Sequence, residues 1–141
     1  MLQTIDRSDD NTERQRELAP GVPSDALEHI DLGIMIVDAE LRIEAINGQA
    51  RRILDISGDF VQSGTTLEDI FRRNAGNGRY GAGDIEQQVR LRTDRAKRFE
   101  AQEFERTQPD GTTIHVKRTP LPKNRLLTVY SDVTAARKFE R

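Results

Sequence analysis

The stretch that decides the fold is Leu126–Thr134, which reads LLTVYSDVT and leads into the charged segment 135–141. Its first five residues are apolar or favour strands, so they predict a short buried strand. The strand passes through Asp132, Val133 and Thr134 into a tail that can form a helix. A strand that feeds a helix in this way is typical of an output joint. We therefore expect a sensing module cut from a longer protein, with an effector that lies downstream.

Two further strands are predicted before this one. Residues 112–120 alternate Ile114 and Val116 with polar residues, and residues 99–107 alternate more weakly. The segment 108–111 reads QPDG, in which Pro fixes φ and Gly can take a left-handed conformation, so it predicts a turn between the two strands. The last third of the chain is therefore expected to consist of three antiparallel strands.

The middle of the chain begins with a predicted hairpin and continues with helices. The apolar run 33–37 predicts a buried strand, and 41–46 predicts a second strand after a turn at 38–40. Asn47 can cap a helix over 48–54, Thr65 or Thr66 can cap one over 67–73, and Asp84 can cap a longer helix over 85–96. The glycines from Gly76 to Gly83 predict a loop.

The beginning of the chain divides into a leader and a short helix. Residues 1–23 are polar and charged, which predicts a flexible leader, although 12–18 could form a short helix against a partner. Ser24 can cap a helix that carries Leu27, Ile30 and Leu32. We expect a leader at 1–23, one domain at 24–134 and the start of an exit helix at 135–141. The predicted fold class is α+β, with a five-stranded antiparallel sheet and short helices across one face.

Composition excludes several classes of function. The 141 residues fit one domain, and 22 basic against 24 acidic residues give a net charge of −2, so no nucleic-acid partner is expected. There is no cysteine, which excludes disulfides, thiolate metal sites and thiol nucleophiles. No apolar run reaches the ~18 residues of a membrane span, and the start lacks the pattern of a secretion signal. We expect a cytoplasmic protein without metal site, catalytic residue or enzymatic activity of its own.

The order and spacing of these motifs resemble the PAS domain over about residues 24–140. Asp38 to Asn47 is similar to the family's first hairpin and helix cap, Pro109 to Gly111 to its third hairpin, and Asp132 to Thr134 to its exit motif. The segment 73–84 resembles a PAS subgroup common in bacterial sensor histidine kinases. The resemblance implies a small pocket between the helices and the inner face of the sheet, an N-terminal helix and an exit helix.

The resemblance also implies which side chains face inward. It places Leu126, Thr128 and Tyr130 on the inner face of the last strand, with Leu127 and Val129 on the outer face. The residues expected to line the pocket are Met35, Val37, Ile46, Phe71, Val116, Arg118, Leu126 and Tyr130. The residues expected to form a dimer interface are Leu27, Ile30, Leu127 and Val129. No cofactor is expected: a cysteinyl flavin needs a Cys, and the helix that carries the haem-ligating His in the family has no His here.

Arg118 and Asp132 each have two interpretations. A buried cation is costly, so Arg118 should pair with an internal carboxylate or reach solvent; alternatively it contacts an anionic ligand. Asp132 should cap the exit helix and, as the family resemblance implies, attract Arg137. The predicted signal exit, which transmits a conformational change from the domain to the effector, would then consist of Asp132, Val133, Thr134 and Arg137.

Three functions are consistent with the sequence. The first is a sensory and dimerisation module that regulates an effector in the same chain, a histidine kinase of a two-component system, with an unidentified small ligand as a possible input. The second is a ligand-independent module that joins two chains. The third is the sensor of a cyclic-dinucleotide enzyme.

Overall fold

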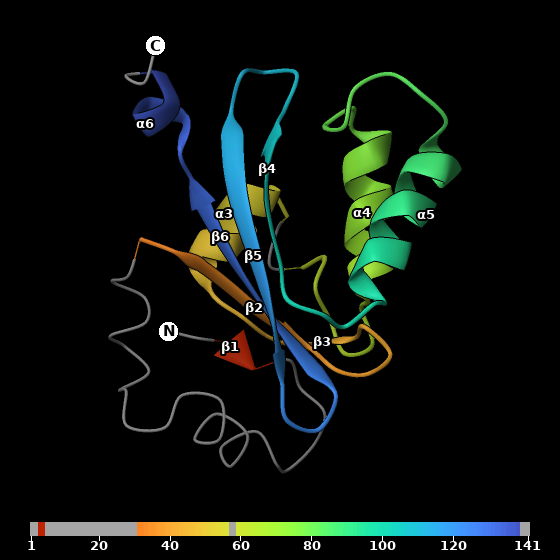
Figure 1. Cartoon of the computed structure of the whole chain (residues 1–141). Coiled ribbons are helices and arrows are strands. Elements are labelled where there is room, and N and C mark those ends of the chain that lie inside the picture. Colours follow the sequence, from red (N-terminus) through yellow and green to blue (C-terminus); the bar gives the residue numbers. More distant parts are fainter. Residues whose placement is uncertain (1–2, 5–30, 57–58, 139–141) are drawn as a thin grey trace.

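An antiparallel sheet forms one layer of the molecule, and three helices form the other (Figure 1). The computed structural model describes residues 3–4, 31–56 and 59–138. The strands are β1 (Gln3–Thr4), β2 (Gly33–Val37), β3 (Ile43–Ile46), β4 (Gln102–Thr107), β5 (Thr113–Leu121) and β6 (Arg125–Asp132). The helices are α3 (Gly48–Leu54), α4 (Leu67–Gly76), α5 (Ile85–Ala96) and α6 (Thr134–Lys138).

The order of the strands in the sheet is β1-β3-β2-β6-β5-β4, and every pairing is antiparallel. The five strands from β2 to β6 confirm the predicted sheet. The two-residue strand β1, which pairs with β3, was not predicted, because residues 1–23 show no apolar periodicity. The predicted N-terminal helix lies outside the described residues with Leu27 and Ile30, and its last apolar residue, Leu32, is exposed in a bend and is not helical.

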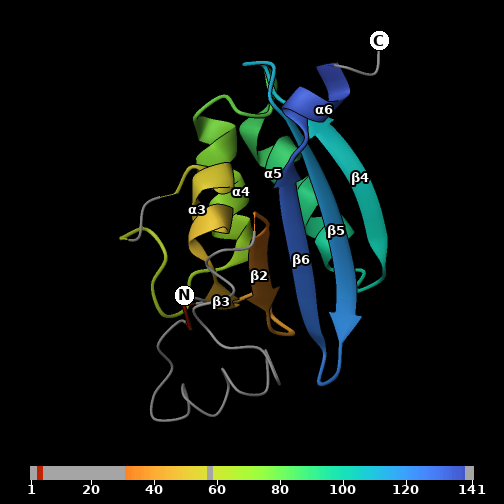
Figure 2. The same cartoon turned by 90° about the vertical axis from the view of Figure 1, so that its left-hand side faces the viewer.

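The helices cover one face of the sheet, as Figure 2 shows from the side. The predicted bounds of α3 and α5 agree with the structure, whereas α4 continues to Gly76 instead of ending at Arg73. Asn74 and Ala75, in its last turn, are buried, so packing extends this helix into a stretch whose glycines predict a loop. None of the helices that the structure describes has the length and hydropathy needed to cross a bilayer.

The main hydrophobic core lies between the two layers. Alternate residues of β6 are buried, Leu126, Thr128 and Tyr130 among them, while Leu127 and Val129 are half-buried on the outer face. This is the alternation predicted for the exit strand. A smaller apolar cluster on the outer face contains Ile34, Ile36, Ala45, Leu121 and Leu127.

Asn47 joins the first hairpin to the helical layer. Its Oδ1 accepts hydrogen bonds from the backbone N–H of Ala50 and of Ile34, each at 2.9 Å, and its Nδ2 donates to the carbonyl of Leu32 at 2.9 Å. Gly33 allows this close approach, because a Cβ there would lie 2.8 Å from the Cα of Ala50. The predicted cap is therefore also a connection between two chain segments.

We expect Asn47→Ala to lower the free energy of unfolding by roughly 2–4 kcal/mol. The change removes a helix cap worth ~1 kcal/mol and two further hydrogen bonds of a side chain that is only 1% exposed. Urea unfolding would measure the loss, with the exposed Asn77→Ala as the control variant. A loss no larger than that of the control would contradict the connecting role of Asn47.

Candidate functional site

Seven of the eight residues predicted to line a pocket belong to the hydrophobic core instead. Each is at most 3% exposed, and all lie in one cluster of packed side chains. They are Met35, Val37, Ile46, Phe71, Val116, Leu126 and Tyr130. The eighth, Arg118, lines a cavity that opens nearer the edge of the sheet. The sequence therefore predicted the inner face of the sheet correctly, but the cavity lies beside the seven predicted residues and not among them.

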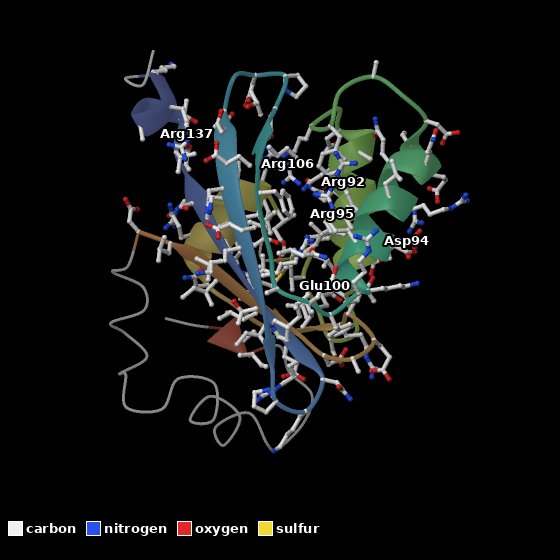
Figure 3. All side chains as sticks on the ribbon, viewed as in Figure 1. Arg92, Asp94, Arg95, Glu100, Arg106 and Arg137 are labelled. Carbon is white, nitrogen blue, oxygen red and sulfur yellow. The ribbon has the colours of Figure 1, made fainter. Side chains whose placement is uncertain are left out.

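The cavity has a volume of about 300 Å³ and lies between α5 and the strands β4 and β5. We call it the arginine pocket, because four of its lining residues are arginines. Figure 3 shows Arg92 and Arg95 extending from α5, and Arg106 from β4, into the same space. The lining residues are Leu91, Arg92, Arg95, Phe104, Glu105, Arg106 and Arg118.

Local structure explains why these side chains meet. Arg92 and Arg95 are three residues apart on α5, so they share one face of the helix. On β4, Phe104 and Arg106 are half-buried while their neighbours are exposed, because successive residues of a strand point to opposite faces. Arg118 lies opposite Gln102 in the β4–β5 ladder, which places it on the same inner face.

Arg118 is the most deeply buried of the four arginines. It is 4% exposed, and its terminal nitrogen donates to Oε1 of Gln102 at 3.1 Å. Its Nε has no hydrogen-bond partner, and burial lowers the pKa of the guanidinium. Among the described residues no carboxylate pairs with Arg118, so the predicted internal pair is not found there, and burial of the side chain contradicts the predicted escape to solvent. The side chain is held by a neutral amide and remains a cation with unused bonding capacity.

Two aromatic rings lie among the guanidinium groups. The Arg92 guanidinium carbon is 3.6 Å from the centroid of the Tyr80 ring, and that of Arg106 is 5.1 Å from the same centroid. Arg95 and Arg118 approach the Phe104 ring at 4.5 and 5.4 Å. Each ring is therefore approached by two cations and attracts both through its negatively polarised face.

No carboxylate neutralises the arginine pocket within the part of the chain that the structure describes. No ion pair there involves any of the four arginines. Asp94, next to Arg95 in sequence, is exposed and points away from the pocket (Figure 3). Glu105 is among the lining residues, but its carboxylate binds Arg137. The pocket therefore has an excess of positive charge.

The contact between Glu105 and Arg137 connects β4 to the exit helix. Arg137 Nε donates to both carboxylate oxygens of Glu105 at 2.9 Å, and a terminal nitrogen of Arg137 also contacts this carboxylate. The guanidinium lowers the pKa of Glu105 through hydrogen bonding and charge. The residues on either side of Glu105 are Phe104 and Arg106, which line the arginine pocket. One strand thus carries pocket residues inward and the partner of the exit helix outward.

Asp132 has a more local role than predicted. Its Oδ1 accepts from the backbone N–H of Thr134 at 2.9 Å and from the Thr134 hydroxyl at 2.5 Å. The same hydroxyl oxygen accepts from the backbone N–H of Thr113 at 2.9 Å, and the N–H of Val133 donates to the carbonyl of Thr113 at 2.9 Å. The expected attraction of Arg137 by Asp132 is wrong, because Arg137 pairs with Glu105. The exit is fixed to β5 by Thr134 and to β4 by Arg137.

A second hollow, of about 540 Å³, lies beside α4 and is open to solvent. It also contains arginines, but Arg72 already pairs with Glu68 and Glu86 at 3.2 and 2.9 Å. Arg72 is thus neutralised by two carboxylates, and Asp69 adds a negative charge to the lining, so this hollow makes a weaker candidate site for an anion. No group of three or more His, Cys, Asp or Glu side chains in the described ranges could hold a metal ion.

Comparison with known proteins agrees with this architecture. A family model described as the PAS fold matches residues 27–141. No curated protein matches the chain. The PAS domain of BvgS from Bordetella pertussis is similar in structure, with a TM-score of 0.60, 15% identity, and coverage of 94% of this chain and 96% of that one.

Two further solved structures are similar at a lower level. A domain of a sensory box sensor histidine kinase/response regulator from Geobacter sulfurreducens has a TM-score of 0.47 and 20% identity, covering 86% of this chain and 93% of that one. The PAS domain of nitrogen regulation protein NR(II) from Vibrio parahaemolyticus has a TM-score of 0.43 and 16% identity, covering 79% and 98%. At these identities the likenesses concern the fold alone.

Proposed function

The chain belongs to the PAS family and is a PAS sensory domain, and from that premise we propose that it regulates a downstream effector in the same protein, a histidine kinase of a cytoplasmic two-component system. The family match and the resemblance to the PAS subgroup of bacterial sensor kinases support this role. The chain itself serves as the regulatory part, and phosphoryl transfer takes place in the effector.

The observation that carries the proposal is the path from the arginine pocket to the exit helix. A ligand that moves Phe104 or Arg106 also moves Glu105, because the three are consecutive on β4. Glu105 holds Arg137, and Arg137 lies on α6, from which the chain continues. Occupancy of the pocket can therefore change the position of α6 through one strand and one ion pair.

The effector can be identified by assay of the full-length protein. We expect autophosphorylation from ATP on a histidine, which is labile to acid, and transfer to an aspartate of a response regulator. Synthesis or hydrolysis of a cyclic dinucleotide instead would make this the sensor of that class of enzyme and overturn the kinase assignment. If the full-length protein showed neither of these activities, that result would favour a module that only joins two chains.

The outer apolar cluster supports dimerisation as part of the same function. Leu127 packs against this cluster and lies opposite Ile36 in the β2–β6 ladder. Val129 is half-buried on the same face. Two copies that meet through this face would bring their exit helices into register, which a dimeric effector needs.

We expect Leu127→Glu to raise the dissociation constant of the dimer roughly 30-fold or more, because an unpaired carboxylate buried in an apolar contact costs at least ~2 kcal/mol. Sedimentation velocity over a concentration series would measure the change. Ile85→Glu, which introduces the same charge on the helical layer at a residue that is 41% exposed, is the control. A monomeric wild type, or equal effects of the two variants, would show that this interface is wrong.

A further inference from the structure

We propose that the arginine pocket binds a compact anion with at least two negative charges, such as a small di- or tricarboxylate or a phosphorylated metabolite. The inference rests on the proposed sensory role and names the class of ligand that would act there. It follows from the number of cations, their unused bonding capacity and the size of the space.

The charge of the pocket sets the minimum charge of the ligand. Arg92, Arg95, Arg106 and Arg118 line one cavity, and no described carboxylate pairs with any of them. Repulsion between neighbouring cations raises the free energy of the folded protein, and the repulsion grows as water is excluded. Burial and the neighbouring Arg106 and Arg95 act together to lower the pKa of Arg92. A ligand with a single charge would leave most of this repulsion uncompensated.

The depth of the arginines shows how such a ligand would be held. Arg118 lies at the base and is 4% exposed, Arg92 and Arg106 are half-buried, and Arg95 is exposed at the rim. The Nε atoms of Arg118 and Arg106 are both buried without a hydrogen-bond partner. A guanidinium offers its donors in a planar fork that matches the two oxygens of a carboxylate or phosphate. One anionic group can therefore enter between Arg106 and Arg118, and a second can remain near Arg92 and Arg95.

The size of the pocket limits the ligand to a small molecule. About 300 Å³ is at the lower end of the range of small-molecule sites. Phe104 and Leu91 add apolar surface to the lining, against which a short carbon skeleton between the charged groups of the ligand can pack. A nucleotide with a base and several phosphates would exceed this space. A cation, including a metal ion, would be repelled.

Binding can be measured with defined probes on the purified chain. Isothermal titration calorimetry and thermal unfolding would be carried out with succinate, citrate, inorganic phosphate and pyrophosphate, each at the same ionic strength as the reference in sodium chloride. Acetate is the probe with one charge. We expect at least one di- or trivalent probe to bind and to raise the melting temperature, by roughly 5 °C or more at ~100 times its dissociation constant. A response to the carboxylates only, or to the phosphates only, identifies the source of the anion.

Variants then locate the binding to the arginine pocket. Arg118→Met and Arg106→Gln should each raise the dissociation constant roughly 10-fold or more, because a hydrogen bond to a charged group is lost. Arg90→Gln makes the same change in charge on the exposed side of α5 and should bind like the wild type. Arg106→Gln tests the site even if Arg118→Met fails to fold. Binding that survives in both pocket variants, or no preference for multivalent anions over acetate, would overturn the inference.

The two proposals can fail separately. Multivalent binding that leaves the activity of the full-length protein unchanged would overturn the regulatory role and keep the class of ligand. The opposite result is also possible. If none of these anions changes the activity of the full-length protein, while substitutions at Glu105 and Arg137 do, the class of ligand would be overturned and the connection through α6 would stand.

Discussion

Arg118→Met is expected to make the ligand-free domain more stable and to weaken its response to multivalent anions. The wild-type side chain buries a cation that is held by Gln102 and by no carboxylate. Replacing a buried ion pair by apolar side chains of similar volume is often neutral or stabilises a protein by about 1–4 kcal/mol, and a buried cation held by an amide has no ion-pair attraction to lose. The lost hydrogen bond to Gln102 offsets ~1 kcal/mol of that gain, since Gln102 is half-buried and can bind water instead.

The measurement is a pair of melting curves, with and without citrate or pyrophosphate. We expect the ligand-free melting temperature to rise by roughly 3–10 °C and the ligand-induced increase to fall by about half or more. The combination is informative, because a residue that only supports the fold would lower the melting temperature when it is replaced. Arg90→Gln, exposed on α5, should change neither value by more than about 2 °C. A destabilised Arg118→Met variant that responds to anions as strongly as the wild type would show that Arg118 is structural and that the ligand binds elsewhere.

Interactions that are close in sequence were predicted well. Asn47, Thr66 and Asp84 each cap the helix expected of them, and the QPDG segment forms its turn, with Gly111 at a φ of 92°. Caps and turns depend on residues within about four positions, so the chain specifies them locally. The inner face of β5 was also predictable, because Ile114 and Val116 alternate with polar residues, whereas that of β6 came from the family resemblance.

The arginine pocket could not be predicted from the same kind of pattern. Arg92, Arg95 and Arg106 occur in polar segments, where an arginine is ordinarily on a solvated face. The weak alternation of β4 leaves its register open, since Phe104 is the only apolar side chain on that strand. Only the pairing of Gln102 with Arg118 and of Phe104 with Val116 decides that Arg106 points inward. The spacing of Arg92 and Arg95 was the one sequence feature that could have indicated a shared charged face.

The partner of Arg137 was missed for a related reason. Asp132 is five residues away and was the obvious local choice, whereas Glu105 is 32 residues away on the edge strand. Glu103 and Glu105 lie on one exposed face of β4, where a carboxylate is ordinarily solvated. In the structure that face meets the exit helix at one end, where α6 contacts β5 and Arg137 reaches Glu105 of β4 (Figure 2). The Glu105 carboxylate therefore contacts the exit helix because α6 packs at this end of the sheet.

Reversing the charge at either side of that joint should disconnect the arginine pocket from the effector. In Glu105→Arg two cations face each other where Arg137 was held, so α6 is no longer fixed to β4. Arg137→Glu has the same effect with two carboxylates. Both side chains are about one-third exposed, so the fold should be nearly unaffected, with a melting temperature within about 3 °C of the wild type. Binding of the anion should also be retained, because the Glu105 carboxylate contacts Arg137 on the face of β4 opposite to Phe104 and Arg106.

The decisive readout is the activity of the full-length protein with and without the anion that the wild type binds. Typical couplings between two sites correspond to a change of about 5–150-fold, and we expect each single variant to respond less than about twofold. The double variant Glu105→Arg/Arg137→Glu restores an ion pair of reversed polarity and should recover the response, which neither a general loss of stability nor a change in the pocket would produce. Glu103→Arg, on the same face of β4 and without contact to α6, is the matched control and should respond like the wild type. If the single variants respond normally, the conformational change is transmitted to α6 through the hydrogen bonds of Thr134 and Val133 to β5. The ion pair of Glu105 with Arg137 would then only hold the helix in place.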